Sequence, residues 1–368
     1  MTRIGSHEKK VLINHAMKSM RQKLRSKEKR RAKRKRMQNI SKEQIRKQQE
    51  NDRLRFQFRD YMHIKAPSCL SMIENTEGTL AFISRLEGAL RKREKVFIVL
   101  KHVDKIASGA IVVLLSIMMK FRANQIGFNG DYPKNKDARQ YLIYSGFFDK
   151  LYQQDGDALT LKGQHGIFTH ANKVVDSRLS DQLITNVSRL IWGEPYRCPG
   201  VQKVYIELMQ NTNNHASLHG PNEHHWYTTV TFNREKKKAY FSFIDYGVGI
   251  IESINRNEKG KFWNALSKIM SVLHPQNNGD FLRLLLDGSI HKTATGEYYR
   301  GKGLPGIYKA FVDNKISNLV VITNDALADC KHKTYRTLTN KFVGTYVSWE
   351  LDFNNVKLPY QYDYNFDS

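Results

Sequence analysis

The chain has 368 residues, three cysteines and a formal net charge of +25 at pH 7. Three cysteines far apart exclude the disulfide framework of a small secreted domain. No apolar run reaches the roughly 18 residues of a membrane span, and the first residues show no secretory signal pattern. We therefore expect a soluble, cytoplasmic protein of two or three structural units, without a membrane partner.

The positive charge is concentrated in an N-terminal arm, residues 1–64. The first 60 residues carry 21 Lys and Arg against 6 Asp and Glu. The segment Lys18–Arg36 holds twelve basic residues, one acidic residue and no aromatic residue. Its long unbranched side chains favour a basic helix. Three interpretations stay open: a solvated helix that aids solubility, a contact with nucleic-acid phosphates, or docking on an acidic protein.

Residues 66–155 alternate short apolar segments with amphipathic ones, which predicts a small α/β unit. The segment KVFIVL at 95–100 is continuously apolar, as in a strand buried on both faces. We expect strands at 68–73, 95–100 and 125–130, and helices at 78–94, 108–124 and 135–152. The unit should therefore be a βαβ sheet covered by helices.

Within this unit, HVDKIASG at 102–109 follows a strand and precedes a buried helix, and YLIYSGFFDKL lies in the closing helix. This order resembles a STAS domain of the anti-anti-sigma type. In phosphorylatable members of that family the acceptor serine stands just before the glycine, a position held here by Ser108. Because Ile106 and Ala107 replace the usual Asp-Ser, we favour a helix N-cap for Ser108 over a phosphorylation site.

Residues 156–180 are polar and rich in turn formers, and we interpret them as a linker. A second domain would follow at 181–353, with a C-terminal tail at 354–368. In this domain IELMQNTNNHA places Glu207, Asn211 and His215 at i, i+4 and i+8, near one face of a helix.

Two glycine-rich motifs follow that helix. FSFIDYGVGI reads as an apolar strand that ends at Asp245 and continues into Gly247 and Gly249. RGKGLPGIYKAF opens a helix with glycines at 301, 303 and 306. Glycine allows the backbone to approach a ligand where a Cβ atom would intrude.

A carboxylate and a carboxamide on one helix, an Asp at a strand end and a glycine-rich helix start resemble the GHKL ATPases, the Bergerat-fold superfamily. The resemblance implies an α/β sandwich, a mixed sheet with helices on one face, that binds ATP and Mg²⁺. It implies that Asp245 receives the adenine amino group, Asn211 holds Mg²⁺ and Glu207 is the general base. The further residues that it assigns to ATP binding are His215, Gly247, Gly249, Arg300, Gly301, Lys302, Gly303, Gly306 and Thr345.

From these features we interpret the chain as a regulatory ATPase, a STAS-like unit fused to a GHKL unit behind a basic arm. It would bind ATP with Mg²⁺ and signal the nucleotide state to a macromolecular partner. Hydrolysis should be slow unless a second subunit completes the site. Two alternatives stay open: a protein-serine kinase of the anti-sigma partner-switching type, and a nucleic-acid-associated scaffold with a vestigial nucleotide site.

Overall fold

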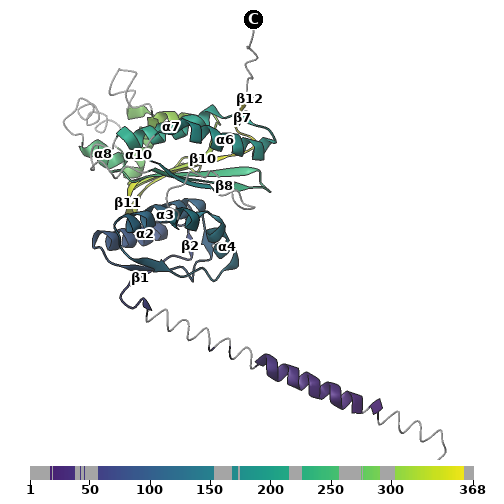
Figure 1. Cartoon of the computed structure of the whole chain (residues 1–368). Coiled ribbons are helices and arrows are strands. Elements are labelled where there is room, and N and C mark those ends of the chain that lie inside the picture. Colours follow the sequence, from purple (N-terminus) through teal and green to yellow (C-terminus); the bar gives the residue numbers. More distant parts are fainter. Residues whose placement is uncertain are drawn as a thin grey trace, which may run out of the picture. The chain divides into compact units, whose positions relative to one another are not determined.

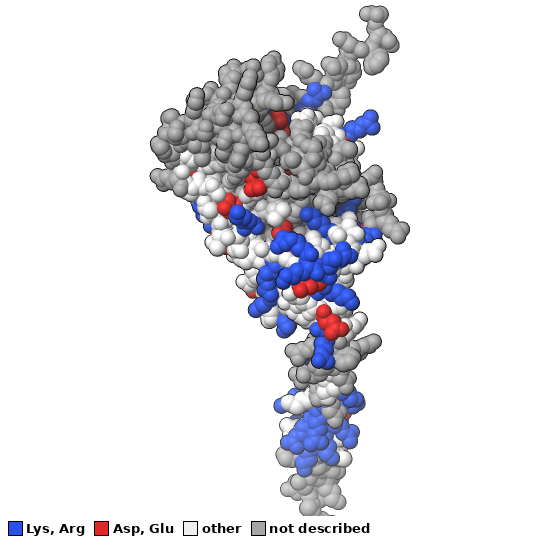
Figure 2. Space-filling view, turned by 90° about the vertical axis from the view of Figure 1, so that its left-hand side faces the viewer, with Lys and Arg blue, Asp and Glu red and all other residues white. Residues whose placement is uncertain are grey.

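The structure is a computed structural model of the whole chain. It describes residues 17–18, 20–37, 42, 45, 57–152, 168–172, 175–214, 226–256, 275, 277–290 and 303–359. Contacts between residues divide the chain into two units, Met1–Tyr61 and Met62–Ser368. In the first unit, residues 20–37 form a helix whose side chains are all exposed. Lys and Arg side chains cover much of the surface of this helix (Figure 2).

The N-terminal half of the second unit is built on a three-stranded parallel sheet in the order β1-β3-β5. Its strands are β1 (Met62–Lys65), β3 (Val96–Val99) and β5 (Phe128–Gly130). A second parallel pair joins β2 (Cys69–Leu70) to β4 (Lys105–Ile106). The helices are α2 (Thr76–Arg91), α3 (Ser108–Ala123), α4 (Lys136–Tyr144) and α5 (Phe147–Tyr152). This arrangement confirms the predicted parallel βαβ unit.

Two details of this half differ from the sequence prediction. Strand β1 was not predicted, because only Ile64 of its four residues is buried and no apolar pattern marks it. The helix expected at 135–152 is instead two helices, α4 and α5. Gly146 lies between them with a left-handed φ of 74°, which ends the first helix.

The C-terminal half is built on a five-stranded sheet in the order β10-β11-β9-β8-β6. Its strands are β6 (Phe168–Asn172), β8 (Trp226–Asn233), β9 (Lys238–Asp245), β10 (Ser317–Asp329) and β11 (Thr334–Leu351). We predicted a mixed sheet, but every described pair of strands in it is antiparallel. The reason is that β8–β9 and β10–β11 are hairpins that pair directly. Residues 168–172, within the expected linker, form the edge strand β6.

The helices described in this half are α6 (Ser177–Trp192), α7 (Pro199–Asn214), α8 (Ile250–Arg256), α10 (Asn278–Leu286) and α12 (Gly303–Val312). A short pair joins β7 (Tyr196–Arg197) to β12 (Leu358–Pro359). Helices α6, α7 and α10 lie over one face of the five-stranded sheet (Figure 1). None of the described helices is long and apolar enough to cross a membrane.

The other face of the five-stranded sheet is covered by α2 and α3 of the N-terminal half (Figure 1). The helices that belong to the C-terminal half thus lie on one face, as we predicted, but the cover that the N-terminal half provides on the other face was not predicted. Strand β9 explains the result, because residues of both its faces are buried. Phe241 and Phe243 belong to the core on the α7 side, whereas Ile244 shares a core with α3.

Polar contacts join the two halves as well. The Ser116 hydroxyl of α3 donates a hydrogen bond to the Tyr246 hydroxyl at 2.8 Å. On α2, the Glu77 carboxylate accepts from the Arg336 guanidinium at 3.2 Å and from the Thr339 N–H at 3.0 Å. Burial alone would raise the pKa of Glu77, but these partners together lower it.

Candidate functional site

Helix α7 presents two of the predicted site residues on the side that does not pack on the sheet. Its buried side is anchored by Tyr205, whose ring makes edge contacts with Trp349 at 5.1 Å and with Phe241 at 6.1 Å between centroids. Glu207 and Asn211 are half-buried and lie one helical turn apart. The sequence therefore predicted correctly that these two side chains share a face of one helix.

Helix α12 begins directly against Glu207 and Asn211. A Cβ atom at Gly303 would lie 3.2 Å from both Asn211 Nδ2 and Glu207 Oε2. A larger residue at this position would press on both side chains. The first N–H groups of a helix have no partner within the helix, so the start of α12 brings hydrogen-bond donors to the carboxylate and the carboxamide.

Lys203 is a further member of this group that the sequence analysis did not select. It lies one turn before Glu207 on the same face of α7 and is exposed. A Cβ atom at Gly306 would lie 3.1 Å from Lys203 Cε and 3.9 Å from Glu207 Oε1. The i, i+4 spacing from Glu207 was the available signal. The structure therefore places a cation beside the carboxylate and the first turn of α12.

Asp245 is the last residue of β9, paired in register with Trp226 on one side and Thr345 on the other. Side chains alternate along a strand, so Asp245 lies on the same face as Phe243, the face that α7 covers. Burial raises the pKa of the Asp245 carboxyl to about 7, although the Gly247 N–H donates to it and Lys120 is near. Burial of a carboxyl group costs free energy unless the group is hydrogen-bonded.

Two residues of β10 hold the loop after Asp245, and both were missed from the sequence. The Thr323 hydroxyl accepts from the Ile250 N–H at 2.8 Å and lies 3.2 Å from the Thr345 hydroxyl. The Asn324 carboxamide donates to the Val248 carbonyl at 2.8 Å and accepts from the Ile251 N–H at 3.1 Å. These contacts fix the turn that carries the two glycines.

Of the two glycines of this turn, Gly249 is required for steric reasons and Gly247 is tightly packed. Gly249 has a φ of 84°, and a Cβ atom there would lie 2.4 Å from Asn324 Oδ1. At Gly247 a Cβ atom would lie 3.2 Å from Asp245 Oδ2. Neighbouring Gly344 on β11 has a φ of 119°, and its Cβ would meet the Asp245 carbonyl oxygen at 2.0 Å. The backbone is thus drawn closely around Asp245.

The structure therefore brings the predicted residues into two groups on one face of the sheet. Glu207, Asn211, Gly303 and Gly306 form the first group, and Asp245, Gly247, Gly249 and Thr345 form the second. Four predicted residues lie outside the described residues: His215, Arg300, Gly301 and Lys302. Within the described part of the chain, no cluster of three or more His, Cys, Asp or Glu side chains could hold a metal ion.

Ser108 lies on the opposite face of the sheet. The N-cap of α3 is Ala107, with extended backbone angles, and Ser108 is the first helical residue, so the predicted N-cap role for Ser108 is wrong. Its hydroxyl lies near the Tyr141 hydroxyl. The next residue, Gly109, packs against Tyr346, whose side chain faces away from α7.

No family model matches this chain, and neither the curated proteins nor the solved structures include a significant match.

Proposed function

We propose that the chain is an ATP·Mg²⁺-binding protein of the GHKL type that acts as a nucleotide-dependent switch on a macromolecular partner. The observation that carries the proposal is the packing of the α12 N-terminus on α7. There Gly303 and Gly306 meet the side chains of Lys203, Glu207 and Asn211. A glycine-rich helix start beside a carboxamide, a carboxylate and a cation suits a phosphate chain with its metal ion.

In the same proposal, Asp245 binds the adenine base of ATP. Its carboxyl group is held at the end of β9 on the face that α7 covers, and it offers an acceptor for an exocyclic amino group. Gly247 and Gly249 let the turn pack closely on Asp245 and Asn324, because a Cβ atom at either position would meet one of these side chains. Thr323 and Asn324 fix the turn, so that little reorganisation is needed on binding.

Side chains of α7 suit the binding of Mg²⁺ and the hydrolysis of ATP. Asn211 offers one neutral oxygen, which suits Mg²⁺ because this ion keeps most of its ligands as water and phosphate oxygens. Glu207, one turn away, would accept the proton of an attacking water. Lys203 would stabilise negative charge on the terminal phosphate. A bound Mg²⁺ would supply charge neutralisation of the phosphates.

Magnesium dependence tests the role of Asn211. We expect Mg²⁺ to strengthen ATP binding to the wild type, and Asn211→Ala to remove roughly tenfold of that gain, the effect of losing one polar partner of a charged group. Isothermal titration calorimetry with and without EDTA measures both affinities. The matched control is Gln210→Ala, because Gln210 is the exposed neighbour on the same helix. An unchanged Mg²⁺ dependence in Asn211→Ala would remove Asn211 from the metal site.

The position of Ser108 favours a switch over a kinase that phosphorylates its own chain. Glu207 lies on α7, on one side of the sheet, and Ser108 begins α3 on the other side. Transfer of a phosphoryl group between them within one chain would require the sheet to open. The kinase alternative therefore needs a serine on another molecule.

The basic arm is the element of the proposal that would contact a polyanionic partner. The twelve Lys and Arg between Lys18 and Arg36 are carried by exposed positions, and the arm is a separate unit. We expect log affinity for duplex DNA or RNA to fall linearly with log salt, with a slope of about 0.9 per phosphate contacted on DNA. Filter binding of the full chain at several salt concentrations measures this slope.

Deletion of residues 1–40 is the matching test for the arm. It should abolish polyanion binding and leave ATP affinity unchanged, because every proposed ATP-site residue lies in the other unit. If the truncated chain binds nucleic acid as tightly as the full chain at every salt concentration, the arm is not the nucleic-acid element. It would then be assigned to docking on an acidic protein.

A further inference from the structure

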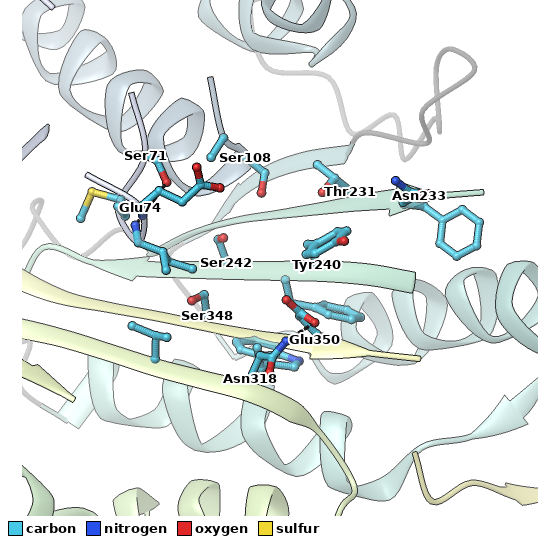
Figure 3. Close-up of a pocket in the computed structure, with 18 of the residues that line it drawn as sticks. Ser71, Glu74, Ser108, Thr231, Asn233, Tyr240, Ser242, Asn318, Ser348 and Glu350 are labelled. Atoms are coloured by element: carbon cyan, nitrogen blue, oxygen red, sulfur yellow. Dashed lines mark hydrogen bonds between the residues drawn. The ribbon is translucent and has the colours of Figure 1, made fainter. Parts of the chain in front are cut away.

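A cavity of about 960 Å³ lies between the N-terminal half and the five-stranded sheet, on the face away from α7. Cavities of roughly 300–1,000 Å³ are the size of small-molecule sites in proteins. Figure 3 shows the sheet below, with Thr231, Tyr240, Ser242 and Ser348 along it, and Ser71 and Ser108 above. The open cavity is thus lined by residues that are far apart in the sequence.

The floor of the cavity carries hydroxyl groups from three neighbouring strands. Thr231 is on β8, Tyr240 and Ser242 are on β9, and Ser348 is on β11. The Ser348 side chain is only 5% exposed, and its hydroxyl lies beside the Tyr346 hydroxyl, which also contacts Ser242 at 3.2 Å. The hydroxyl groups of the floor can donate and accept hydrogen bonds, which favours a polar ligand.

The roof is the first turn of α3, a helix of 16 residues. Its N-cap residue, Ala107, has no side chain that could accept from the first N–H groups of the helix. Ala107, Ser108 and Gly109 all line the cavity. The Tyr141 hydroxyl lies near both Ser108 on the roof and Thr231 on the floor, and these two hydroxyls lower its pKa while burial raises it to about 12. A helix start that lacks a capping acceptor favours a negative group.

The rim of the cavity carries charged residues of both signs. Glu74 pairs with Lys105 at 2.6 Å and Glu350 with Lys238 at 2.8 Å, and the Asp329 carboxylate contacts the His332 ring at 2.8 Å. Three rim cations, in contrast, have no acidic partner among the described residues. They are Arg234, Lys236 and Lys331. The only other acid that lines the described rim is Glu235.

We propose that this cavity is a second ligand site, which binds a small phosphorylated, hydroxyl-rich metabolite of the sugar-phosphate or nucleoside-monophosphate class. The hydroxyl groups of the floor suit the hydroxyls of a sugar, and the rim cations with the start of α3 suit the phosphate. The site lies across the sheet from Glu207 and Asp245. It therefore stands independently of the proposed ATP site.

Because the roof and floor belong to different halves, a ligand here would hold the N-terminal half against the sheet. Gly109 shows how closely they already approach, since a Cβ atom there would lie 2.1 Å from the Tyr346 hydroxyl oxygen. The opposite face of the same strands carries Asp245 and Thr345. Ligand binding would thus stabilise the sheet from the side that the nucleotide does not touch.

The reaction rate of a thiol placed on the roof measures access to the cavity, whichever ligand the cavity binds. The variant is Ser108→Cys in a Cys69→Ser background, because Cys198 and Cys330 are buried and burial raises the pKa of each to about 12. The full chain is treated with an anionic and a cationic methanethiosulfonate reagent of similar size. We expect the anionic reagent to react roughly tenfold faster, because the rim attracts negative charge.

Charge reversal at the rim checks the cause of that preference. Arg234→Glu with Lys236→Glu should remove or invert the preference for the anionic reagent. Lys237→Glu is the matched control, since Lys237 is exposed in the same turn but does not line the cavity. No reaction of the introduced thiol in folded protein, or faster reaction of the cationic reagent, would overturn the proposal.

The ligand class is tested by protection of the same thiol. Ribose 5-phosphate, glucose 6-phosphate, AMP and GMP are added at millimolar concentration, and we expect at least one of them to slow modification by roughly tenfold. Ribose, glucose and inorganic phosphate should not protect, and Ser348→Ala should reduce the protection. AMP and GMP are repeated in Asp245→Asn, to separate this site from the proposed ATP site. If no phosphorylated compound protects, or if the free sugars protect equally, the proposal is wrong.

Discussion

Asp245→Asn is expected to stabilise the folded protein above pH 7 and to weaken ATP binding by at least roughly tenfold. The stabilising effect follows from the burial that raises the pKa of Asp245 from 3.8 to about 7. The loss of affinity follows from the proposed role, because the amide offers a neutral acceptor and a donor where adenine presents its amino group. Opposite effects on stability and binding are typical of a residue retained for function.

The sign of the pH dependence follows from the protons bound in each state. Between pH 3.8 and about 7 the folded protein holds a proton on Asp245 that the unfolded chain has released. Stability therefore falls as pH rises through this window, and the full cost of the buried carboxylate is present above pH 7. The shift corresponds to a free energy on the order of 4 kcal/mol. Below pH 3.8 both states are protonated and this cost is absent.

Urea unfolding of the wild type and of Asp245→Asn at pH 4, 5.5, 7 and 8.5 measures the effect. The difference in the free energy of unfolding should be smallest at pH 4 and largest above pH 7. Asp104→Asn is the matched control, because Asp104 is exposed and should show no such growth. A variant that is less stable than the wild type at pH 8.5 would show that the carboxylate has a structural partner. Equal ATP affinity by calorimetry would remove Asp245 from the site.

The elements that carry the site could be predicted from the sequence because their signals are local. The i, i+4 spacing of Glu207 and Asn211 lies within α7, and the apolar run before Asp245 is β9. The glycines at 303 and 306 begin α12 as expected. Each of these patterns needs only about a dozen consecutive residues to be recognised.

The parts that the sequence did not predict depend on contacts between distant segments. The second covered face of the sheet rests on pairs such as Ser116 and Tyr246, 130 residues apart. Likewise, Asn324 holds a turn more than 70 residues earlier in the chain. Only the sequence of β9 contained a clue, because FSFI is apolar or small on both faces and thus typical of a strand covered twice.

Glu207→Gln is expected to lower the rate of ATP hydrolysis by roughly 100-fold or more while ATP affinity changes little. A general base acts on the attacking water in the transition state, so its loss lowers kcat and leaves ground-state binding almost intact. Glutamine keeps the size of the side chain, so that its contact with the start of α12 at Gly303 is preserved. The effect should therefore report on proton acceptance and not on packing.

Phosphate release measures turnover, and calorimetry with Mg²⁺ measures affinity, both on the full chain. Glu194→Gln is the control, because Glu194 is exposed beyond the end of α6. Lys203→Ala separates the neighbouring cation from the base, since loss of Lys203 should weaken ATP binding where loss of Glu207 does not. If Glu207→Gln hydrolyses ATP as fast as the wild type, or if the wild type hydrolyses none with its partners present, Glu207 is not a general base. The α7–α12 contact would then serve nucleotide binding alone.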